Sequence, residues 1–377
     1  MKSVAKPGLD AKRLASWALA VAALLFVAWM VPVRDRCWDP GAPASTRVAV
    51  TRNTSSTATG CVLHLRTGDV AVDDEACGRL KCEPGVLSTF ARARLVVVVG
   101  LLGLYVLGTL AMAGRWKALL SFAGIDLPLM RVWLISTEAL AGGILLPGGI
   151  GGDALRIAAV ASRPSRAGEA RSPLSVVIAS VLLDRAVGLS LIAGVAAALG
   201  ALSGGAGASP LVAILASIPV AVVVAIVVLR NAPLHRIRQL SEGRLGRVVA
   251  PVLTYVRDPR APRAIALAAA LSVVVAAIQF SAIRGLVFAL GASPTADRWV
   301  YVGTAMAFIV GAIPALPGGW GTADAAYVFF FAFAGIGSGA ALAVCLVYRL
   351  FGYACGAAGA ILYVARRTTR SARETFR

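Results

Sequence analysis

Long apolar segments alternate with short polar, arginine-rich ones along most of this 377-residue chain. Six apolar runs reach or exceed the roughly 18 residues that are typical of a membrane-spanning helix. They cover residues 14–33, 93–113, 173–202, 210–229, 264–290 and 339–365. Hydrophobic residues make up 58% of the sequence and charged residues only 15%, with a mean hydropathy of +0.80. We therefore predict an all-α polytopic membrane protein with six spanning helices.

Two further apolar segments, residues 132–162 and 299–337, are interrupted by nearly the same motif. Proline stops a helix, and a glycine cluster permits backbone shapes that other residues resist. Broken backbone at membrane depth survives only inside protein or beside a watery cavity, and matching interruptions in two halves point to a transporter's substrate site. We predict two re-entrant hairpins whose tips bind substrate, formed by Pro147, Gly148, Gly149 and Gly151 and by Pro317, Gly318, Gly319 and Gly321.

Lys and Arg residues predict the orientation of the chain, because cytoplasmic loops carry an excess of them. Residues 1–33 comprise a basic N-terminal tail and the first predicted helix. Because this tail, the loop 230–263 and the C-terminal tail 366–377 are all basic, both termini should be cytoplasmic. A cleaved signal peptide is the alternative for the N-terminus, but the small-x-small pattern at 42–44 lies about ten residues past the apolar core, too far for a normal cleavage region. The segment 34–92 should be extracytoplasmic.

The same counting gives the two hairpins opposite orientations. The first is flanked by basic residues on both sides, with Arg115, Lys117 and Arg131 before it, and both flanks should be cytoplasmic. The second follows a connector with one Asp and one Arg and should begin and end outside. Residues 93–229 and 264–365 are thus predicted to form an inverted-topology repeat.

The net charge of +19 raises the question of nucleic-acid binding. The basic residues sit in short loops beside apolar segments, and neither a nucleic-acid motif nor a long basic face is present. Positive-inside topology and attraction to anionic headgroups explain the charge better. Enzyme signatures are also weak, because the sequence has no Walker lysine motif, metal-binding His cluster or nucleophile elbow, and it implies no cofactor.

Four of the six cysteines, Cys37, Cys61, Cys77 and Cys82, lie in the polar segment 34–92. Such a cluster indicates either two disulfides in an oxidising compartment or a metal site. The spacing from Cys77 to Cys82 is loose for zinc, and the segment follows a membrane span, so we predict disulfides. The sequence leaves all three pairings open. A module of this size has a small core, which disulfides would staple.

Charged residues inside apolar segments are expensive and usually face protein or a cavity. Arg185 and Arg349 are the main candidates, because each lies in the span after a hairpin and begins an Arg-x-x-Gly motif. Guanidinium groups match phosphate oxygens bidentately, and half-helix N-termini at the tips add positive potential. We predict that they hold a phosphate-bearing headgroup. The alternative is that Arg185 pairs with Asp184 or Glu138 and only joins helices.

Acidic residues near the tips have two possible interpretations, as helix caps or as residues that couple transport to protons or substrate. Asp153 follows the first tip with Arg156 three residues on, which indicates either an N-cap with a local ion pair or a role in substrate or proton coupling. Asp324 occupies a similar place after the second tip, which favours capping. Glu138 lies in the apolar helix before the first tip and is the leading proton-coupling candidate.

The motifs Leu146–Arg156, Leu183–Gly188 and Pro317–Gly321 together resemble the flippase-like family, named for the transmembrane region of lysylphosphatidylglycerol synthetases. The resemblance covers about residues 93–365. It implies an inner-membrane protein of a prokaryote that handles lipid. No soluble aminoacyl-transfer domain follows residue 365, which argues against lipid aminoacylation by this chain and leaves room for a lipid-modifying enzyme as partner. The segment 34–92 lies outside the pattern.

The expected function is movement of an anionic, aminoacylated or polyprenyl-phosphate-linked lipid across the membrane. One alternative is a membrane-embedded glycosyl- or acyl-lipid transferase that uses the acidic residues. Another is an accessory subunit of envelope lipid assembly that acts through residues 34–92. The sequence does not determine the oligomeric state.

Overall fold

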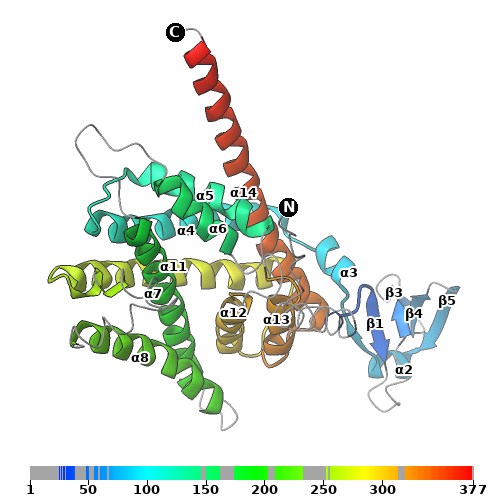
Figure 1. Cartoon of the computed structure of the whole chain (residues 1–377). Coiled ribbons are helices and arrows are strands. Elements are labelled where there is room, and N and C mark those ends of the chain that lie inside the picture. The colour runs from blue at the N-terminus through cyan, green and yellow to red at the C-terminus, as the bar shows by residue number, and fades with distance from the viewer. Residues whose placement is uncertain are drawn as a thin grey trace, which may run out of the picture.

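The computed structural model describes most of the chain (Figure 1). The described residues are 25, 27, 29, 31–38, 48–50, 55–57, 60–65, 68–145, 150–161, 174–202, 209–231, 252–253, 255–312 and 319–375. Most of the predicted first helix, most of the loop 230–263 and part of the tail lie outside this set. So do the tip residues Pro147, Gly148, Gly149, Pro317 and Gly318.

A small antiparallel sheet occupies the segment before the long helices, so the all-α expectation was wrong for this part. Its strands are three to six residues long, too short for alternating hydrophobicity to reveal them, and cross-strand pairing stabilises them. The order is β3-β4-β2-β1-β6, with β5 also paired to β4. The elements are β1 (Asp35–Trp38), β2 (Val48–Val50), β3 (Ser55–Thr57), β4 (Gly60–Leu65), β5 (Gly68–Asp73), α2 (Asp74–Arg79), β6 (Lys81–Glu83) and α3 (Val86–Ala91).

A disulfide joins the edge of this sheet. Cys37 in β1 and Cys82 in β6 are directly opposite in the register and are bonded. This confirms a disulfide in the N-terminal segment. Cys77 is also disulfide-bonded. Cys61 lies in β4, and its side chain is outside the described part of the structure.

The rest of the described chain is helical. Its elements are α4 (Leu95–Phe122), α5 (Leu129–Leu145), α6 (Ile150–Ala161), α7 (Leu174–Ala201), α8 (Ser209–Asn231), α11 (Ala261–Ala289), α12 (Asp297–Gly311), α13 (Thr322–Ala332) and α14 (Ser338–Thr375). Among the described residues, five helices are long and apolar enough to cross a membrane, in α4, α7, α8, α11 and α14. The protein is therefore a multi-pass membrane protein.

The second predicted span was too short. It was expected to end at residue 113, followed by a basic segment, but α4 continues to Phe122. Arg115 therefore lies inside a helix, with only 5% of its surface exposed. Packing explains the difference, since Trp116, Leu119 and Leu120 are fully buried and extend the helix. Positive-inside counting treats any arginine near a span end as a loop residue and cannot see a buried partner.

Two pairs of short helices lie between the long ones. The pairs α5–α6 and α12–α13 lie where the two broken segments were predicted, and the two members of each pair pack against each other. In the first pair, an added Cβ on Gly152 would come within 2.8 Å of the Ala139 carbonyl oxygen, so glycine permits close contact. In the second, Gly319 and Gly321 have φ angles of +69° and +78°, which glycine adopts without strain.

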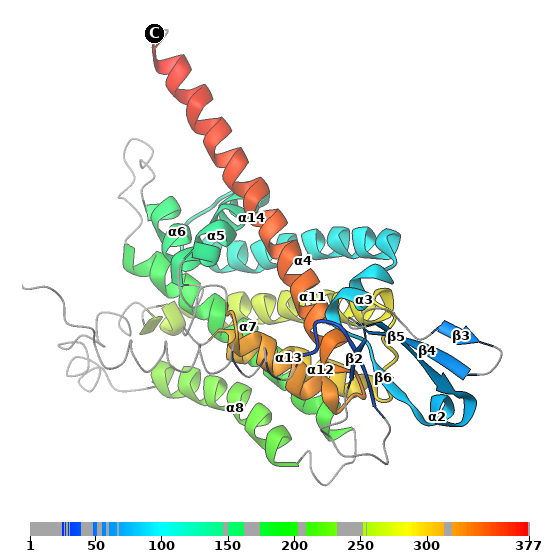
Figure 2. The same cartoon turned by 90° about the vertical axis from the view of Figure 1, so that its right-hand side faces the viewer.

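The helical region has two halves, one made of α4, α5, α6 and α7 and the other of α11, α12, α13 and α14, and their helices pack against each other in a matching pattern. Helix α4 lies along α11, α5 packs against α14, and α12 packs against α7 (Figures 1 and 2). The elements α4, α5–α6 and α7 thus correspond in order and packing to α11, α12–α13 and α14. Helix α8 packs on α7.

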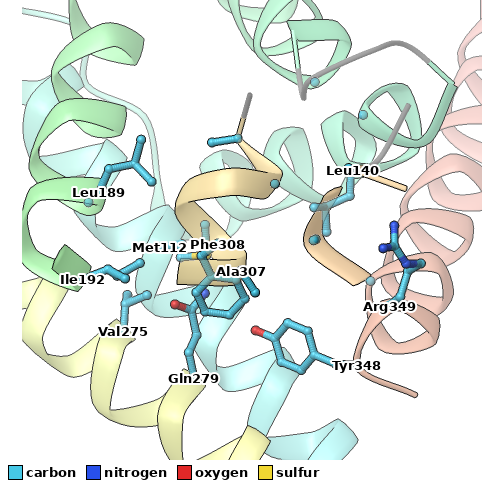
Figure 3. A pocket seen from close by; sticks show the side chains of 18 of the residues that line it. Met112, Leu140, Leu189, Ile192, Val275, Gln279, Ala307, Phe308, Tyr348 and Arg349 are labelled. Carbon is cyan, nitrogen blue, oxygen red and sulfur yellow. The ribbon is translucent and has the colours of Figure 1, made fainter. Parts of the chain in front are cut away.

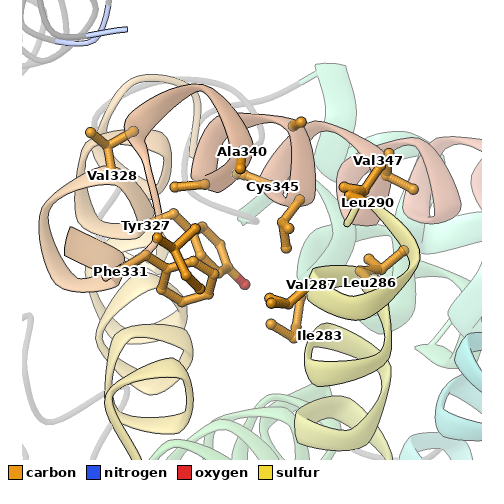
Figure 4. Close-up of a cluster of buried hydrophobic side chains, with 14 of the residues drawn as sticks. Ile283, Leu286, Val287, Leu290, Tyr327, Val328, Phe331, Ala340, Cys345 and Val347 are labelled. Atoms are coloured by element: carbon orange, nitrogen blue, oxygen red, sulfur yellow. The ribbon is translucent and has the colours of Figure 1, made fainter. Parts of the chain in front are cut away.

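The largest buried cluster joins the second half to the sheet segment. Side chains of α11, α13 and α14 meet there, including Ile283, Phe331 and Val347 (Figure 4). Val31 and Val86, which flank the sheet in sequence, pack into the same cluster. The sheet segment is therefore anchored to the end of the helical region at which α14 begins.

Candidate functional site

A cavity of about 580 Å³ lies between the two halves. Its lining residues come from α4, α5, α6 and α7 of the first half and from α11, α12, α13 and α14 of the second. Figure 3 labels ten of them, among them Leu189 and Ile192 of α7, Val275 of α11 and Arg349 of α14. Four arginines, Arg115, Arg156, Arg185 and Arg349, are among its lining residues. The wall also includes apolar residues such as Met112, Leu189 and Ile192. The cavity is therefore basic at some positions and apolar at others.

Helices α6 and α7 are joined by two crossed ion pairs. Asp153 of α6 accepts hydrogen bonds from Arg185 of α7, with Nη2–Oδ1 and Nε–Oδ2 distances of 3.0 and 3.1 Å. Arg156, one turn along α6, lies 3.6 Å from the Asp184 carboxylate. The expected local pair between Asp153 and Arg156 is thus replaced by pairs to the neighbouring helix. The sequence suggested Asp184 or Glu138 as a partner for Arg185, whereas the structure pairs it with Asp153, and through this pair Arg185 joins α7 to α6.

Arg115 is a site residue that sequence reasoning missed. Its Nε donates to Asp184 at 2.6 Å, and its Nη1 donates to Ser272 of α11 at 3.1 Å. A Cβ at Gly188 would lie only 2.6 Å from Nη1, so this glycine makes room for the guanidinium. The signal that could have revealed Arg115 was the apolar pattern that continues after it to Phe122.

A buried tryptophan supports this cluster. Trp116 lies beneath the Arg156 guanidinium, 5.2 Å from the ring centroid, and its indole N–H donates to Ser180 at 3.3 Å. Cation–π attraction strengthens when the cation is removed from water. Asp184 is only 2% exposed and lies between Arg115 and Arg156, so it neutralises two buried cations in part.

In the second half, Asp324 and Arg349 form an ion pair at the cavity. Asp324 accepts from Arg349 at 2.7 Å and from the Cys345 thiol at 2.9 Å. Its other oxygen accepts the Gly321 backbone N–H at 2.8 Å, which caps the start of α13 as expected for this position. The Arg349 guanidinium stacks over Trp320, 4.3 Å from the ring centroid. Asp324 therefore caps one helix and holds the arginine of the next.

The same arrangement occurs in both halves. An Asp at the start of the helix after each tip pairs with an Arg in the following long helix, as Asp153–Arg185 and as Asp324–Arg349. The glycine of each Arg-x-x-Gly motif also accommodates a side chain of α4. Gly188 faces Arg115, and a Cβ at Gly352 would lie 3.2 Å from the Tyr105 hydroxyl. The two motif regions thus share an Asp–Arg pair between corresponding helices.

The structure brings some predicted site residues together and leaves others apart. Asp153, Arg156, Arg185, Gly319 and Arg349 line the cavity, and Asp184 and Asp324 bind its arginines. Glu138 does not line it. Its backbone nitrogen would lie 2.8 Å from a Cβ at Gly359, which places Glu138 where α5 crosses α14. Gly151 is buried in α6, and Gly321 begins α13.

These ion pairs contain one more positive than negative charge. Four guanidinium groups face three carboxylates, those of Asp153, Asp184 and Asp324. The excess lies in the first half, where Arg115, Arg156 and Arg185 meet two Asp residues, since Arg349 and Asp324 balance. The Arg185 side chain is 44% exposed, compared with 9% for Arg349. Among the described residues, the cavity's four arginines thus outnumber by one the carboxylates that form these pairs, and Arg185 is the most exposed of the four.

A family model places the chain among known proteins. A search of curated proteins found no significant match. The family model described as "Lysylphosphatidylglycerol synthase TM region" matches residues 85–359. This match includes both Asp–Arg pairs and every helix around the cavity, and it begins after the sheet. Because it covers well over half of the chain, the protein belongs to the lysylphosphatidylglycerol synthase TM region family, a flippase-like family of membrane proteins.

Proposed function

We propose that the protein moves a lipid with an anionic, aminoacylated or polyprenyl-phosphate-linked headgroup across the cytoplasmic membrane of a prokaryote. The observation that carries this proposal is the cavity between the halves, which has four arginines and one excess positive charge. Buried charge in a membrane protein is costly, so a cluster of this kind indicates a functional site. A phosphate group has the charge and oxygen geometry that arginine binds best.

Arg185 is the proposed first contact for the phosphate. Asp153 occupies its Nε and Nη2 groups, and among the described residues no hydrogen bond is assigned to Nη1. A guanidinium has five N–H donors, so the pair with Asp153 orients the group without exhausting it. Arg349 of α14 also lines the cavity, held by Asp324 and Trp320. The headgroup would lie between these arginines while the acyl tails stay in lipid.

The two halves would form an inverted-topology repeat with re-entrant hairpins α5–α6 and α12–α13. Their reciprocal packing and the repeated Asp–Arg pair support this reading. Helices of 17, 12, 15 and 11 residues are shorter than the five long helices, as expected for segments that enter and return. Rocking of one half against the other would alternate access to the cavity. Both termini would be cytoplasmic and residues 34–92 extracytoplasmic.

Thiol labelling at the two tips tests this topology. With Cys345 and Cys355 replaced by alanine, a cysteine at Gly318 should react with an impermeant maleimide added from the extracytoplasmic side. A cysteine at Gly148 should not, because its tip opens to the cytoplasm. Inside-out vesicles should reverse the pattern. Equal labelling of both positions from one side would contradict the inverted repeat.

Lipid movement in liposomes that contain the purified protein tests the function. The vesicles would carry labelled phosphatidylglycerol, its cationic aminoacyl form or a polyprenyl phosphate, and the label in the outer leaflet would be quenched chemically. Transport of at least one lipid, faster than in protein-free vesicles, is expected. If folded protein moved none of them, the proposal would fail. Recovery of a chemically altered lipid would favour the transferase alternative. If the protein neither moved nor altered any lipid, the accessory-subunit alternative would be favoured.

A further inference from the structure

The sheet segment touches the helical region at the first residue of α14. Glu83, the last residue of β6, accepts hydrogen bonds from the Ser338 backbone N–H at 2.7 Å and from the Ser338 hydroxyl at 2.8 Å. The first four N–H groups of a helix have no partner within the helix. A carboxylate is also favoured there by the helix dipole. Glu83 thus caps a helix that begins 255 residues later in the chain.

Backbone packing makes this contact tight. A Cβ at Gly339 would lie 2.4 Å from the Pro84 carbonyl oxygen and 3.1 Å from the Gly85 Cα. A Cβ at Gly337 would lie 3.1 Å from the Glu83 side chain. Two glycines therefore let the start of α14 lie directly against residues 83–85. No flexible side chain separates the two backbones at Gly339.

The Glu83 strand is itself held on its other side. The Cys37–Cys82 disulfide joins β6 to β1 one residue before Glu83. Asp35 of β1 accepts the Gly85 backbone N–H at 2.7 Å and also a hydrogen bond from the Ser88 hydroxyl. Val86 then packs into the cluster that includes Ala340 and Val344. Residues on both sides of Glu83 are fixed, so its carboxylate has a defined position.

Helix α14 carries residues of the cavity only a few turns further on. Cys345, Tyr348 and Arg349 line the cavity. Since a helix rises about 1.5 Å per residue, Arg349 lies roughly 16 Å along the axis from Ser338. The helix is pinned again at Gly359, where a Cβ would lie 2.6 Å from the Thr137 backbone. The stretch between Ser338 and Gly359 is therefore held at both ends.

We propose that Glu83 is a positioning residue that holds the N-terminal half of α14, and with it Cys345 and Arg349, in place beside the cavity. Glu83 lies outside the segment 85–359 that the family model matches. The sheet segment thereby gains a role that the lipid proposal does not assign to it. This inference does not require that lipid be the substrate, because it concerns the position of a helix.

Alkylation of the native cysteines tests it without a transport assay. Cys345 and Cys355, both on α14, are free. In Glu83→Ala, the rate at which N-ethylmaleimide modifies Cys345 should rise about tenfold, because loss of a charge-assisted cap frees the helix start. Cys355, six residues beyond Arg349 and four before the pin at Gly359, should react at the wild-type rate. Mass spectrometry of the two peptides measures both in one sample.

Three further variants sharpen the test. Glu83→Gln keeps an acceptor for Ser338 and should stay close to wild type. Gly339→Ala pushes the backbones apart from the other side and should reproduce the effect of Glu83→Ala. Glu75→Ala removes an exposed acid of the same segment, which forms a surface ion pair with Arg79, and should change nothing. An intact Cys37–Cys82 disulfide in each variant would show that the sheet has folded.

Unchanged labelling of Cys345 in both Glu83→Ala and Gly339→Ala would overturn the proposal, and so would an equal rise in Glu75→Ala. If Glu83→Ala lost the disulfide, Gly339→Ala would decide the outcome. Failure of lipid transport in wild-type vesicles would leave these results untouched. The two proposals therefore fail independently.

Discussion

Replacement of Asp184 with alanine is expected to lower the free energy of unfolding by about 3–5 kcal/mol, the usual cost of leaving a buried charge without its partner. Asp184 lies 2.6 Å from Arg115 and 3.6 Å from Arg156, and all three side chains are at least nine-tenths buried. The substitution leaves two guanidinium groups facing each other with no carboxylate between them. Denaturant titration in mixed micelles measures the change.

Two further variants test whether the unpaired buried cations cause this loss of stability: a control change at an exposed Asp, and a second change that removes one of the cations. Asp126→Ala removes a carboxylate that is 86% exposed and pairs with Lys117 at 3.4 Å, so the loss should be within about 0.5 kcal/mol. Adding Arg156→Met to Asp184→Ala removes one of the unpaired cations and should restore part of the stability. A loss as small as that of Asp126→Ala would mean that water or lipid headgroups already neutralise the cluster.

Arg185→Ala and Arg349→Ala are both expected to reduce lipid movement by about 100-fold or more, since each removes a charge-assisted contact to the headgroup. Their effects on stability should differ. Arg185→Ala leaves Asp153, which is 23% exposed and can be hydrated. Arg349→Ala leaves Asp324, which is buried, and should cost about 3 kcal/mol more in unfolding free energy. Transport and denaturation of the same preparations separate the two effects.

A double variant distinguishes headgroup binding from helix attachment at Arg349. Arg349→Gln with Asp324→Asn replaces the ion pair with neutral groups that can still hydrogen-bond, and it should recover most of the lost stability. Lipid movement should stay low, because the cation is gone. Recovery of both properties would show that Arg349 only joins α13 to α14. Arg260→Ala, an exposed pair partner of Asp258 outside the cavity, should leave movement unchanged.

Hydrophobic patterning determined the membrane class and the order of elements. Five of the six predicted spans correspond to helices long enough to cross a membrane, because each apolar run exceeds the required length whatever it packs against. The interrupted motifs predicted a break in each of two apolar segments, since proline cannot continue a helix, and the structure has the short helices α5–α6 and α12–α13 there. The motifs around them identified the family that the comparison confirmed.

Tertiary structure alone decided which charges meet. Asp153 and Arg156 are one turn apart and suggested a local pair, but helix α7 offers Arg185 and Asp184 at better positions. Arg115 reached the site because Trp116 and Leu120 extend α4 beyond the expected end. Partner choice depends on how helices distant in sequence pack together, which no local pattern encodes.

The disulfide of the sheet and the cap that the sheet segment provides for α14 also depend on tertiary structure rather than on local sequence. Cysteine count and compartment predicted disulfides in residues 34–92, while the Cys37–Cys82 pairing depends on the register between β1 and β6. Glu83 has no sequence signal, since a single acid after a cysteine is unremarkable until Ser338 lies beside it. Which segments are helical and apolar follows from the local pattern of residues, because those properties depend on near neighbours. The cavity, its ion pairs and the contact at Glu83 follow from the packing of the folded chain, because each joins residues that are far apart along it.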